Sequence, residues 1–245
     1  MKNEKITIKA IYSISDTSPH YQGVKTAAAV PLMVLYIIGS KIATYFWERC
    51  LNELKNVSDN SIDLVITDPP YMLSNVGGGL FKNSGRVSMK QIDTMIDGYS
   101  DIVLNEWCRV LKRINCYIFC SQKQIPLLLD YFTKRNCNWN ILCWHKTNPV
   151  PTCNNKYLND TEYCMYFREK GVKIFGSYQT KKTYFVLPVN IKDKKKYNHP
   201  TVKPLEIIET FIINSSEQGD IVLDPFAGTG TTAVAALKHD RNYLC

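Results

Sequence analysis

The sequence lacks the cysteine patterns of a disulfide-stapled or zinc-binding protein. It contains nine cysteines in 245 residues, but none of them forms a C-x-x-C pair. Four lie in apolar runs that are typical of buried strands, which favours a reduced chain in which cysteine acts as a small hydrophobic residue. The four cysteines in apolar runs are Cys116, Cys120, Cys143 and Cys164. We therefore expect no metal site.

The sequence also lacks an apolar run that is long enough to cross a membrane. The longest uncharged run, residues 26–40, has 15 residues and is interrupted by Pro31. A membrane-spanning helix needs about 20 predominantly apolar residues, so a buried strand or helix is the better interpretation. The segment 1–10 is charged and mixed, unlike a signal peptide. Together these absences predict a cytoplasmic protein with no membrane segment.

Acidic residues are almost missing from one stretch of the chain. Between Lys170 and Lys203 there are nine lysines and a single acid, Asp193, so this stretch carries the whole net charge of +8. A concentrated positive patch suits a polyanionic partner, with nucleic acid first and an anionic membrane surface second. A solvated basic loop would have the same composition, so charge alone leaves these alternatives open.

Apolar runs and amphipathic stretches alternate regularly from residue 47 onward, whereas residues 1–46 match no pattern and form an unassigned N-terminal segment. Short apolar runs predict strands that are covered on both faces, and the amphipathic stretches predict helices. The alternation predicts an α/β fold with a doubly wound, mostly parallel sheet. The predicted strands are 62–67, 116–121, 139–144, 162–168, 221–224 and 242–245, and the predicted helices are 47–56, 100–112, 122–135, 204–214 and 228–238.

The first unusual motif is Asp68-Pro69-Pro70-Tyr71, which directly follows the predicted strand 62–67. In such sheets ligands bind beyond the carboxyl ends of the strands. The prolines fix the backbone, so this corner displays a carboxylate, a carbonyl and an aromatic ring together. An amine on a nucleobase needs two acceptors for its N–H groups and a ring to stack on. A tight turn with a packing tyrosine is the alternative, but the intact four-residue string favours function.

A second motif follows the predicted strand 221–224, where a glycine-containing turn leads into a helix. Glycines let the backbone approach a ligand closely, and the helix N-terminus supplies N–H groups. The motif is neither G-x-G-x-x-G nor a phosphate loop, and for a lone G-x-G a packing turn would be the better interpretation. The flanking residues make this motif specific. It consists of Asp224, Pro225, Phe226, Ala227, Gly228, Thr229, Gly230, Thr231 and Thr232.

Together these strings resemble motifs of the amino-methyltransferases that act on DNA. The segment 68–71 resembles their catalytic motif and 224–231 their cofactor motif, and a third match, His-Pro-Thr-Val-Lys-Pro at 199–204, stands ahead of the cofactor motif. The order of the motifs is similar to that of the family's β group. The resemblance implies a Rossmann-like methyltransferase fold with 47–245 as the methyltransferase domain. It also implies S-adenosylmethionine as the cofactor.

The resemblance implies a role for each matching residue. Asp68 and the Pro69 carbonyl would accept the N–H groups of the target amine, Pro70 would complete the rigid corner, and Tyr71 would stack on the base. A base inside a duplex would have to flip out to reach this site. An Asp at the first catalytic position is seen more with adenine than with cytosine in this family, so adenine is favoured. The residues that would surround the cofactor are Asp224, Pro225, Phe226, Gly228, Gly230, Thr231, Thr201 and Lys203.

Residues 147–198 take the place of the family's target-recognition insertion, and most of the lysine excess lies there. Lysines in this stretch would contact phosphates of double-stranded DNA, which gives affinity without sequence choice. The resemblance also allows a restriction endonuclease as a partner. Just ahead of the insertion, Trp144, His145 and Lys146 could wall the base pocket, or Trp144 could pack inside the protein. The phosphate-contacting lysines would be Lys181, Lys182, Lys192, Lys194, Lys195 and Lys196.

Two departures from the family pattern point to an incomplete member. Family members usually continue past the position of Cys245 with a strand and an acidic residue for the cofactor ribose. They also usually carry Gly-Asp where this chain has Glu48-Arg49. The resemblance therefore predicts a member that is truncated at the C-terminus. The alternatives to an active DNA methyltransferase are a catalytically impaired nucleic-acid-binding remnant and an RNA methyltransferase.

Overall fold

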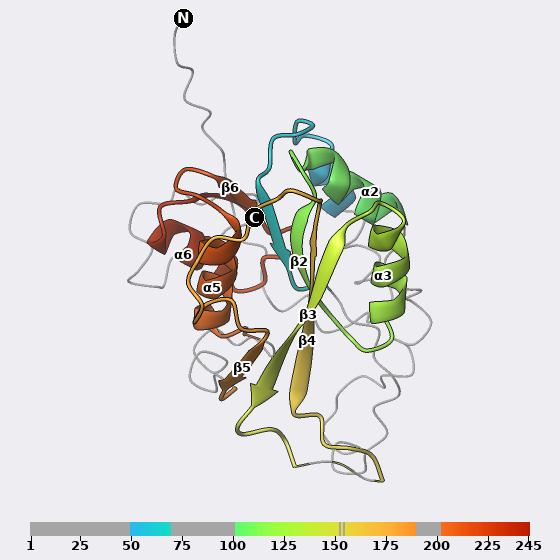
Figure 1. Ribbon diagram of the computed structural model, residues 1–245, viewed down its shortest axis with the longest axis vertical. Helices are drawn as coiled ribbons and strands as arrows, with labels where there is room; N and C mark the ends of the chain where they lie inside the picture. The colour runs from blue at the N-terminus through green and yellow to red at the C-terminus, as the bar shows by residue number, and fades with distance from the viewer. Residues whose placement is uncertain (1–49, 70–100, 152, 154, 190–201) are drawn as a thin grey trace, which may run out of the picture.

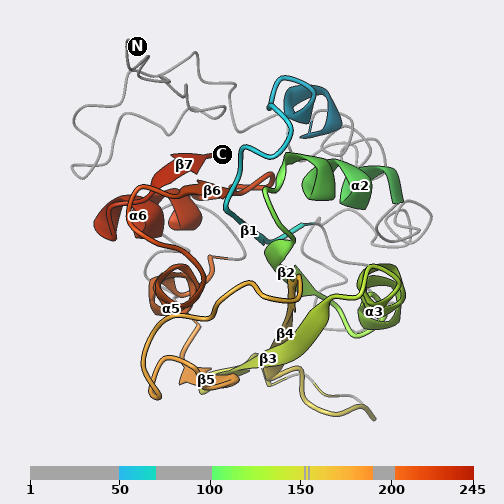
Figure 2. The ribbon, with the colours of Figure 1, turned by 45° about the horizontal axis from the view of Figure 1, so that its top comes forward.

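The computed structural model describes residues 50–69, 101–151, 153, 155–189 and 202–245. These residues form a seven-stranded sheet between two layers of helices, as Figure 1 and Figure 2 show, and the predicted α/β class is confirmed. The strands are β1 (Leu64–Thr67), β2 (Asn115–Cys120), β3 (Asn138–Lys146), β4 (Thr161–Arg168), β5 (Tyr184–Leu187), β6 (Ile221–Leu223) and β7 (Asn242–Leu244). The helices are α2 (Asp101–Val110), α3 (Ile125–Thr133), α5 (Leu205–Ser215) and α6 (Thr231–Lys238), and residues 50–54 form a further helical stretch.

The strands are arranged in the order β5-β3-β4-β2-β1-β6-β7. Strand β1 pairs in parallel with β2 and β6, and the pairs β6–β7 and β3–β5 are parallel as well. Among the described strands β4 alone runs the other way, since it pairs antiparallel with both β2 and β3. One edge of the sheet therefore gathers the carboxyl ends of all the parallel strands and the amino end of β4.

Helices cover both faces of this sheet (Figure 2). Helices α2 and α3 pack on one face together with the stretch 50–54, and α5 and α6 pack on the other. Strand β1 faces both layers, because Val65 belongs to the first core while Leu64 and Ile66 belong to the second. A short strand that is apolar throughout is buried in this way when both faces of its sheet are covered. The predicted doubly wound, mostly parallel sheet is confirmed.

Helix α5 is held against the sheet by buried aromatic and polar contacts. The ring of Tyr117 on β2 stacks on Tyr166 of β4 and on Phe211 of α5, with centroid distances of 4.2 and 4.1 Å. The Tyr117 hydroxyl lies 2.8 Å from Ser215 Oγ, and Asn115 Nδ2 donates to the Ser215 carbonyl at 2.8 Å. Buried polar groups that find partners in this way favour one arrangement of the packed elements. The C-terminal half of α5 is therefore fixed relative to β2 and β4.

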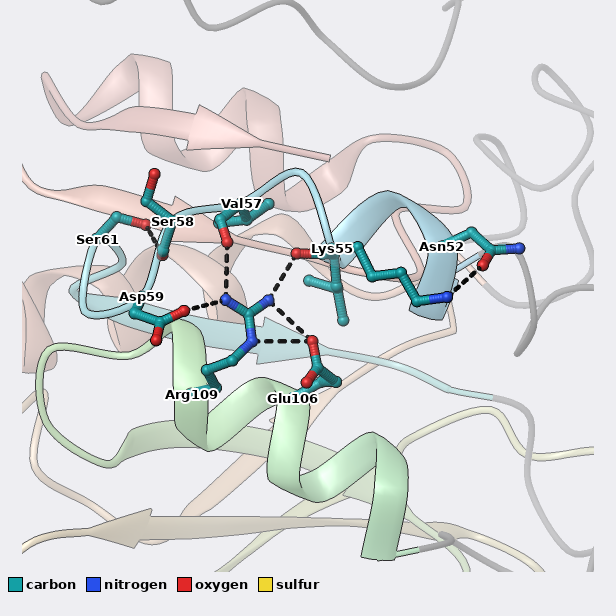
Figure 3. A network of polar contacts seen from close by, with 9 residues as sticks. Asn52, Lys55, Val57, Ser58, Asp59, Ser61, Glu106 and Arg109 are labelled. Carbon is teal, nitrogen blue, oxygen red and sulfur yellow. Dashed lines mark hydrogen bonds and ion pairs between the residues drawn. The ribbon is translucent and has the colours of Figure 1, made fainter.

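Arg109 on α2 ties this helix to the turn that leads into β1 (Figure 3). Its guanidinium donates to the carbonyls of Leu54 and Val57, at 2.7 and 2.9 Å. It also pairs with the carboxylates of Glu106 and Asp59. The Leu54 carbonyl ends the short helical stretch ahead of β1, so the arginine caps a helix C-terminus. These contacts of Arg109 fix the turn that precedes β1, and they thereby help to fix the position of the motif that follows β1.

Two elements differ from their predictions. Strand β5 was not predicted, although Tyr-Phe-Val-Leu has the aromatic and β-branched residues of a strand, because the lysines around it indicated a basic loop. Helix α6 begins at Thr231 rather than at residue 228, because Gly228 and Gly230 have left-handed backbone angles, with φ of 54° and 76°. The other predicted elements are present, with bounds that shift by a few residues.

The cysteines are distributed as small hydrophobic residues would be. All nine are free thiols. Cys116, Cys120 and Cys164 are buried as predicted, and Cys143 is half-buried. None of the helices in the described ranges is long and apolar enough to cross a membrane.

Candidate active site

Two motifs that lie far apart in the sequence meet at the carboxyl edge of the sheet. Asp68 directly follows β1, and Asp224 directly follows β6. The two strands are parallel neighbours, with Val65 opposite Leu223. Both aspartates therefore emerge at the edge where α/β sheets bind their ligands, close enough for their charges to interact. Next to Asp68, Pro69 is buried, and the carboxylate itself is 24% exposed.

A buried ammonium group holds the carboxylate of Asp68. Lys203 Nζ lies 2.7 Å from Asp68 Oδ2, and only 7% of the Lys203 side chain is exposed. The ammonium also lies 4.8 Å from the ring centroid of Phe119 on β2. The resemblance implied a place for Lys203 beside the cofactor, and the structure shows its ammonium paired with Asp68, in the motif that resembles the family's catalytic one.

A second carboxylate and a second lysine extend this ion pair. Glu162, at the start of β4, lies 3.0 Å from Lys203 Nζ through Oε2 and 2.9 Å from Lys146 Nζ through Oε1. Lys146 is the last residue of β3, so the antiparallel pairing of β3 and β4 brings both residues to the same edge. Asp68, Lys203, Glu162 and Lys146 form a row of alternating charges, which we call the ion chain.

Sequence reasoning missed Glu162. It stands near the start of a largely apolar strand, TEYCMYFR, and a carboxylate in such a place is costly unless it is paired. That signal predicts a buried cation but not which one. Of the two interpretations of Trp144, packing is the correct one, because its side chain is 4% exposed and Nε1 donates to the Leu187 carbonyl at 2.9 Å.

Burial and pairing act in opposite directions on the ion chain. Burial by itself would raise the pKa of Glu162, but the ammonium groups of Lys203 and Lys146 hold it below its usual value. Burial by itself would lower the pKa of Lys203, yet Asp68 and Glu162 raise it above its usual value. Glu162 and Lys203 are therefore both charged at neutral pH. The two ammonium groups and the two carboxylates balance, so the ion chain as a whole is neutral.

Asp224, the first residue of the second motif, is buried, with 4% of its surface exposed. Its Oδ2 accepts a hydrogen bond from Thr232 Oγ1 at 2.6 Å, and its Oδ1 accepts one from the Phe226 backbone N–H at 3.1 Å. Burial raises the pKa of Asp224 to about 7, and the negative charge of Asp68 adds to that rise. The carboxyl group thereby braces the turn between β6 and α6 from inside.

Two glycines shape the turn that Asp224 supports. Gly228 and Gly230 adopt positive φ values of 54° and 76°, which strain any residue that has a Cβ. Gly230 stands at the N-cap position of α6 and has no side chain with which to cap the helix. The first-turn N–H groups of α6 can therefore serve a ligand. A cofactor that carries a carboxylate and a polar sugar fits this set of donors.

Other predicted residues lie away from this edge or outside the described ranges. Lys181 and Lys182 are exposed just ahead of β5, so they stand at the amino end of that strand. The predicted insertion 147–198 supplies β4 and β5 to the central sheet. Only the residues of 147–198 outside these two strands are therefore left for an insertion. Outside the described residues lie the segment 1–46 and Pro70, Tyr71, Thr201, Lys192, Lys194, Lys195 and Lys196.

Comparison with known proteins identifies the family. A family model described as a DNA methylase, that of N6 and N4 methyltransferases, matches residues 62–245. The type II methyltransferase M2.MboI of Moraxella bovis is 31% identical over 217 residues, which cover 80% of this chain and 79% of the relative. The type II methyltransferase M.HinfI of Haemophilus influenzae is 30% identical over 223 residues, which cover 80% and 62% respectively. The chain belongs to this DNA methylase family, and the resemblance seen in the motifs is confirmed.

Solved structures show the same architecture. The crystal structure of the M1.HpyAVI–SAM complex matches with a TM-score of 0.54 at 24% identity. The match covers 85% of this chain and 90% of that chain. At this identity the likeness concerns the fold, and it confirms the predicted Rossmann-like methyltransferase fold.

Proposed function

We propose that this chain moves a methyl group from S-adenosylmethionine to the exocyclic amine of a base in double-stranded DNA. The observation that carries the proposal is the Asp68 carboxylate, which is held by the buried Lys203 and stands next to the strand that leads into the glycine turn. An acceptor for an amine and a turn for a cofactor are thereby at adjacent strand ends. Membership of the DNA methylase family supports the same reaction.

The turn between β6 and α6 would hold the cofactor. When bound, S-adenosylmethionine supplies a methyl group on a positively charged sulfur. The first-turn N–H groups of α6 suit its carboxylate, and Gly228 and Gly230 let the backbone come close to it. Phe226, half-buried at the turn, offers a ring to the adenine of the cofactor. The proposed cofactor residues are Asp224, Pro225, Phe226, Gly228, Gly230, Thr231 and Thr201.

Asp68 would act directly on the target amine. An exocyclic amine is a weak nucleophile because its lone pair is delocalised into the ring. Asp68 and the Pro69 carbonyl accept its two N–H groups, which turns the lone pair towards the methyl group. Lys203 holds Asp68 Oδ2 at 2.7 Å, so the carboxylate keeps one orientation. The target nitrogen would become positively charged as it takes up the methyl group, and the Asp68 carboxylate would stabilise that charge until a proton leaves to solvent.

Pro70 and Tyr71 would complete the base pocket, with Tyr71 stacked on a base that has flipped out of the duplex. We place target recognition in the parts of 147–198 that lie between the strands. The segment 147–160 begins where β3 ends, at the same edge as Asp68. Exposed lysines in the later segment would add contacts to phosphates. In this assignment 47–245 is the methyltransferase domain.

Adenine is the proposed target base, because the catalytic motif begins with Asp68, and cytosine is the alternative. Hydrolysis of methylated DNA to nucleosides, followed by mass spectrometry, separates N6-methyladenine from N4-methylcytosine. A cytoplasmic location, which the sequence composition predicts, and a restriction endonuclease as partner, which the resemblance allows, stay predictions.

Transfer of a radiolabelled methyl group to unmethylated double-stranded DNA tests the proposal. The chain should label DNA, and Asp68→Ala should lower kcat by at least about 100-fold, as the loss of a group that stabilises transition-state charge does. The matched control is Asp130→Ala on α3, whose ion pair with Lys134 is exposed, and its rate should equal that of the wild type. Absence of label in DNA, or equal label in RNA or protein under the same conditions, would contradict the proposal.

A further inference from the structure

The proposed mechanism uses Asp68 and Lys203 but leaves Glu162 and Lys146 without a role. Both are largely buried, with 20% of the Glu162 side chain and 13% of the Lys146 side chain exposed. Taking two charges out of water is costly, and replacing a buried ion pair by apolar residues is often neutral or even stabilising. Stability is therefore a weak reason for this pair, and its place directly behind Lys203 suggests a functional one.

We infer that Glu162 is a positioning residue for methyl transfer: it neutralises Lys203 and Lys146, so that Asp68 keeps enough negative charge to stabilise the positive charge that develops on the target amine. The inference rests on the proposed function. It gives Glu162 no direct contact with substrate, since Glu162 acts through Lys203.

The distances show how Lys203 divides its charge. Its Nζ lies 2.7 Å from Asp68 Oδ2 and 3.0 Å from Glu162 Oε2, so one ammonium is shared between two carboxylates. A shared cation cancels only part of the charge on Asp68. Without the Glu162 charge, the whole ammonium would act on Asp68, and Lys146 would add a second uncompensated cation behind it. Both cations would oppose a developing positive charge on the amine, and in a shielded site such forces are weakly screened.

The topology explains why Glu162 reaches this place. Asp68 follows β1, Lys146 ends β3 and Lys203 precedes α5. Glu162 comes from β4, which runs antiparallel to its neighbours, so the beginning of this strand and not its end lies at the carboxyl edge. A parallel strand in the same position would have presented its last residues there.

Four groups from three strands face Lys203: Asp68 after β1, Phe119 on β2, and Glu162 and Cys164 on β4. Burial raises the pKa of the Cys164 thiol well above its usual value, so this group stays neutral. The two carboxylates are therefore what keeps the buried ammonium of Lys203 protonated. Removing the Glu162 charge should make Lys203 lose its proton at a lower pH.

The test uses Glu162→Gln in the full chain with a labelled methyl donor and duplex DNA. We expect kcat to fall at least about 10-fold while the KM values for DNA and cofactor change by less than about 2-fold, because the lost effect belongs to the transition state. The alkaline limb of the kcat–pH profile should move to lower pH, because Lys203 without this anionic neighbour loses its proton earlier and a neutral Lys203 no longer holds Asp68 in one orientation. Glu162→Asp keeps the charge and should retain the wild-type alkaline limb, which a purely steric role would not predict.

A second substitution separates charge balance from packing. Lys146→Met combined with Glu162→Gln removes the second uncompensated cation and restores a neutral ion chain, so it should recover part of the lost kcat. The matched control is Glu169→Gln, just beyond the other end of β4, whose ion pair with Arg113 at 3.1 Å is exposed. It should leave kcat and the pH profile unchanged, and urea unfolding of every variant identifies loss of fold.

The outcomes distinguish the two proposals. A wild-type chain that labels no DNA overturns the proposed function and the role of Glu162 together. An active wild type with an equally active Glu162→Gln overturns the role of Glu162 alone. A fall in kcat that the double variant does not recover, with an unmoved alkaline limb, shows that Glu162 only supports the fold and overturns charge balance.

Discussion

Asp224 shows how one buried carboxyl group can couple this fold to pH. The motif predicted a residue at a strand end, but its burial follows from the packing of β6, β7 and α6 around it. Asp224 N–H donates to the Leu244 carbonyl of β7 at 2.9 Å, and the carboxyl group accepts from Thr232 on α6 at 2.6 Å. In this enclosed position the charged carboxylate loses its contact with water, which raises the pKa of Asp224 to about 7. The neutral form is therefore favoured below that pH.

Asp224→Asn should remove a pH dependence of stability. The unfolded chain releases the Asp224 proton near the ordinary pKa of 3.8, whereas the native state retains it until about pH 7. The contribution of this group to stability is therefore complete below about pH 4 and is lost as pH rises towards 7. The difference in unfolding free energy between variant and wild type should shift by roughly 2–3 kcal/mol in favour of the variant between about pH 5 and about pH 8. Urea titrations at the two pH values measure it, and a constant difference would contradict the prediction.

Among the elements, α5 does more than cover the sheet, because it also anchors the chain between β4 and β5. Phe175 N–H donates to the Asn214 carbonyl at 2.7 Å, and Asn214 Nδ2 donates to the Thr180 carbonyl at 2.7 Å. Gly176 lies between these two contacts with a φ of 73°. The segment between β4 and β5 is thus attached to α5, the helix that follows Lys203. The sequence pattern did not predict this attachment.

Gly176→Ala should destabilise the protein more than Gly219→Ala does. Both glycines have positive φ, 73° and 86°, so both substitutions strain the backbone by about 1–2 kcal/mol. A Cβ at Gly219 meets nothing within 4 Å, whereas one at Gly176 would lie 2.2 Å from Asn214 Oδ1. Asn214 is buried and hydrogen-bonded, so it yields only by losing that bond, which should cost about 1–3 kcal/mol more. Urea unfolding measures both variants, and equal losses would show that the close approach carries no cost.

On the scale of the whole molecule, the charges divide into a balanced interior and a basic exterior. The ion chain at the carboxyl edge pairs each buried cation with a carboxylate, whereas Lys181 and Lys182 are exposed. Buried charge orients groups for chemistry, while exposed charge acts over a longer range and is screened by salt. The lysines of the ion chain should therefore affect the rate of methyl transfer, whereas Lys181 and Lys182 should affect the affinity for DNA.

The double variant Lys181→Ala/Lys182→Ala should weaken DNA binding without changing the chemical step. If each lysine neutralises one phosphate, the slope of log K against log salt should become less negative by about 2. The kcat at saturating DNA should stay at the wild-type value, because neither lysine belongs to the ion chain. Lys55→Ala/Lys134→Ala, with two other exposed lysines, is the matched control. A salt titration of fluorescence anisotropy measures the slope, and equal slopes for wild type and variant would show that the duplex does not reach this segment.

Local pattern was sufficient for the order of the elements and for the motifs at the ends of β1 and β6. Apolar runs and amphipathic stretches record which positions of each element are buried, and that spacing can be detected in one sequence. The antiparallel direction of β4 could not be predicted in that way, because direction depends on which neighbours a strand pairs with. Strand β5 was missed for another reason, because the lysines around it indicated a basic loop, and only its pairing with β3 shows that it belongs to the sheet.

The sequence by itself determined the fold class and, through its motifs, the family, and it singled out Asp68 and Asp224 as candidate site residues. Only the tertiary structure decided that Lys203 holds Asp68, that Glu162 holds Lys203, and that Asp224 is buried enough to retain a proton. Motifs depend on short-range spacing along the chain. The charge and orientation of a side chain depend on groups that strand pairing and helix packing bring from distant parts of the chain.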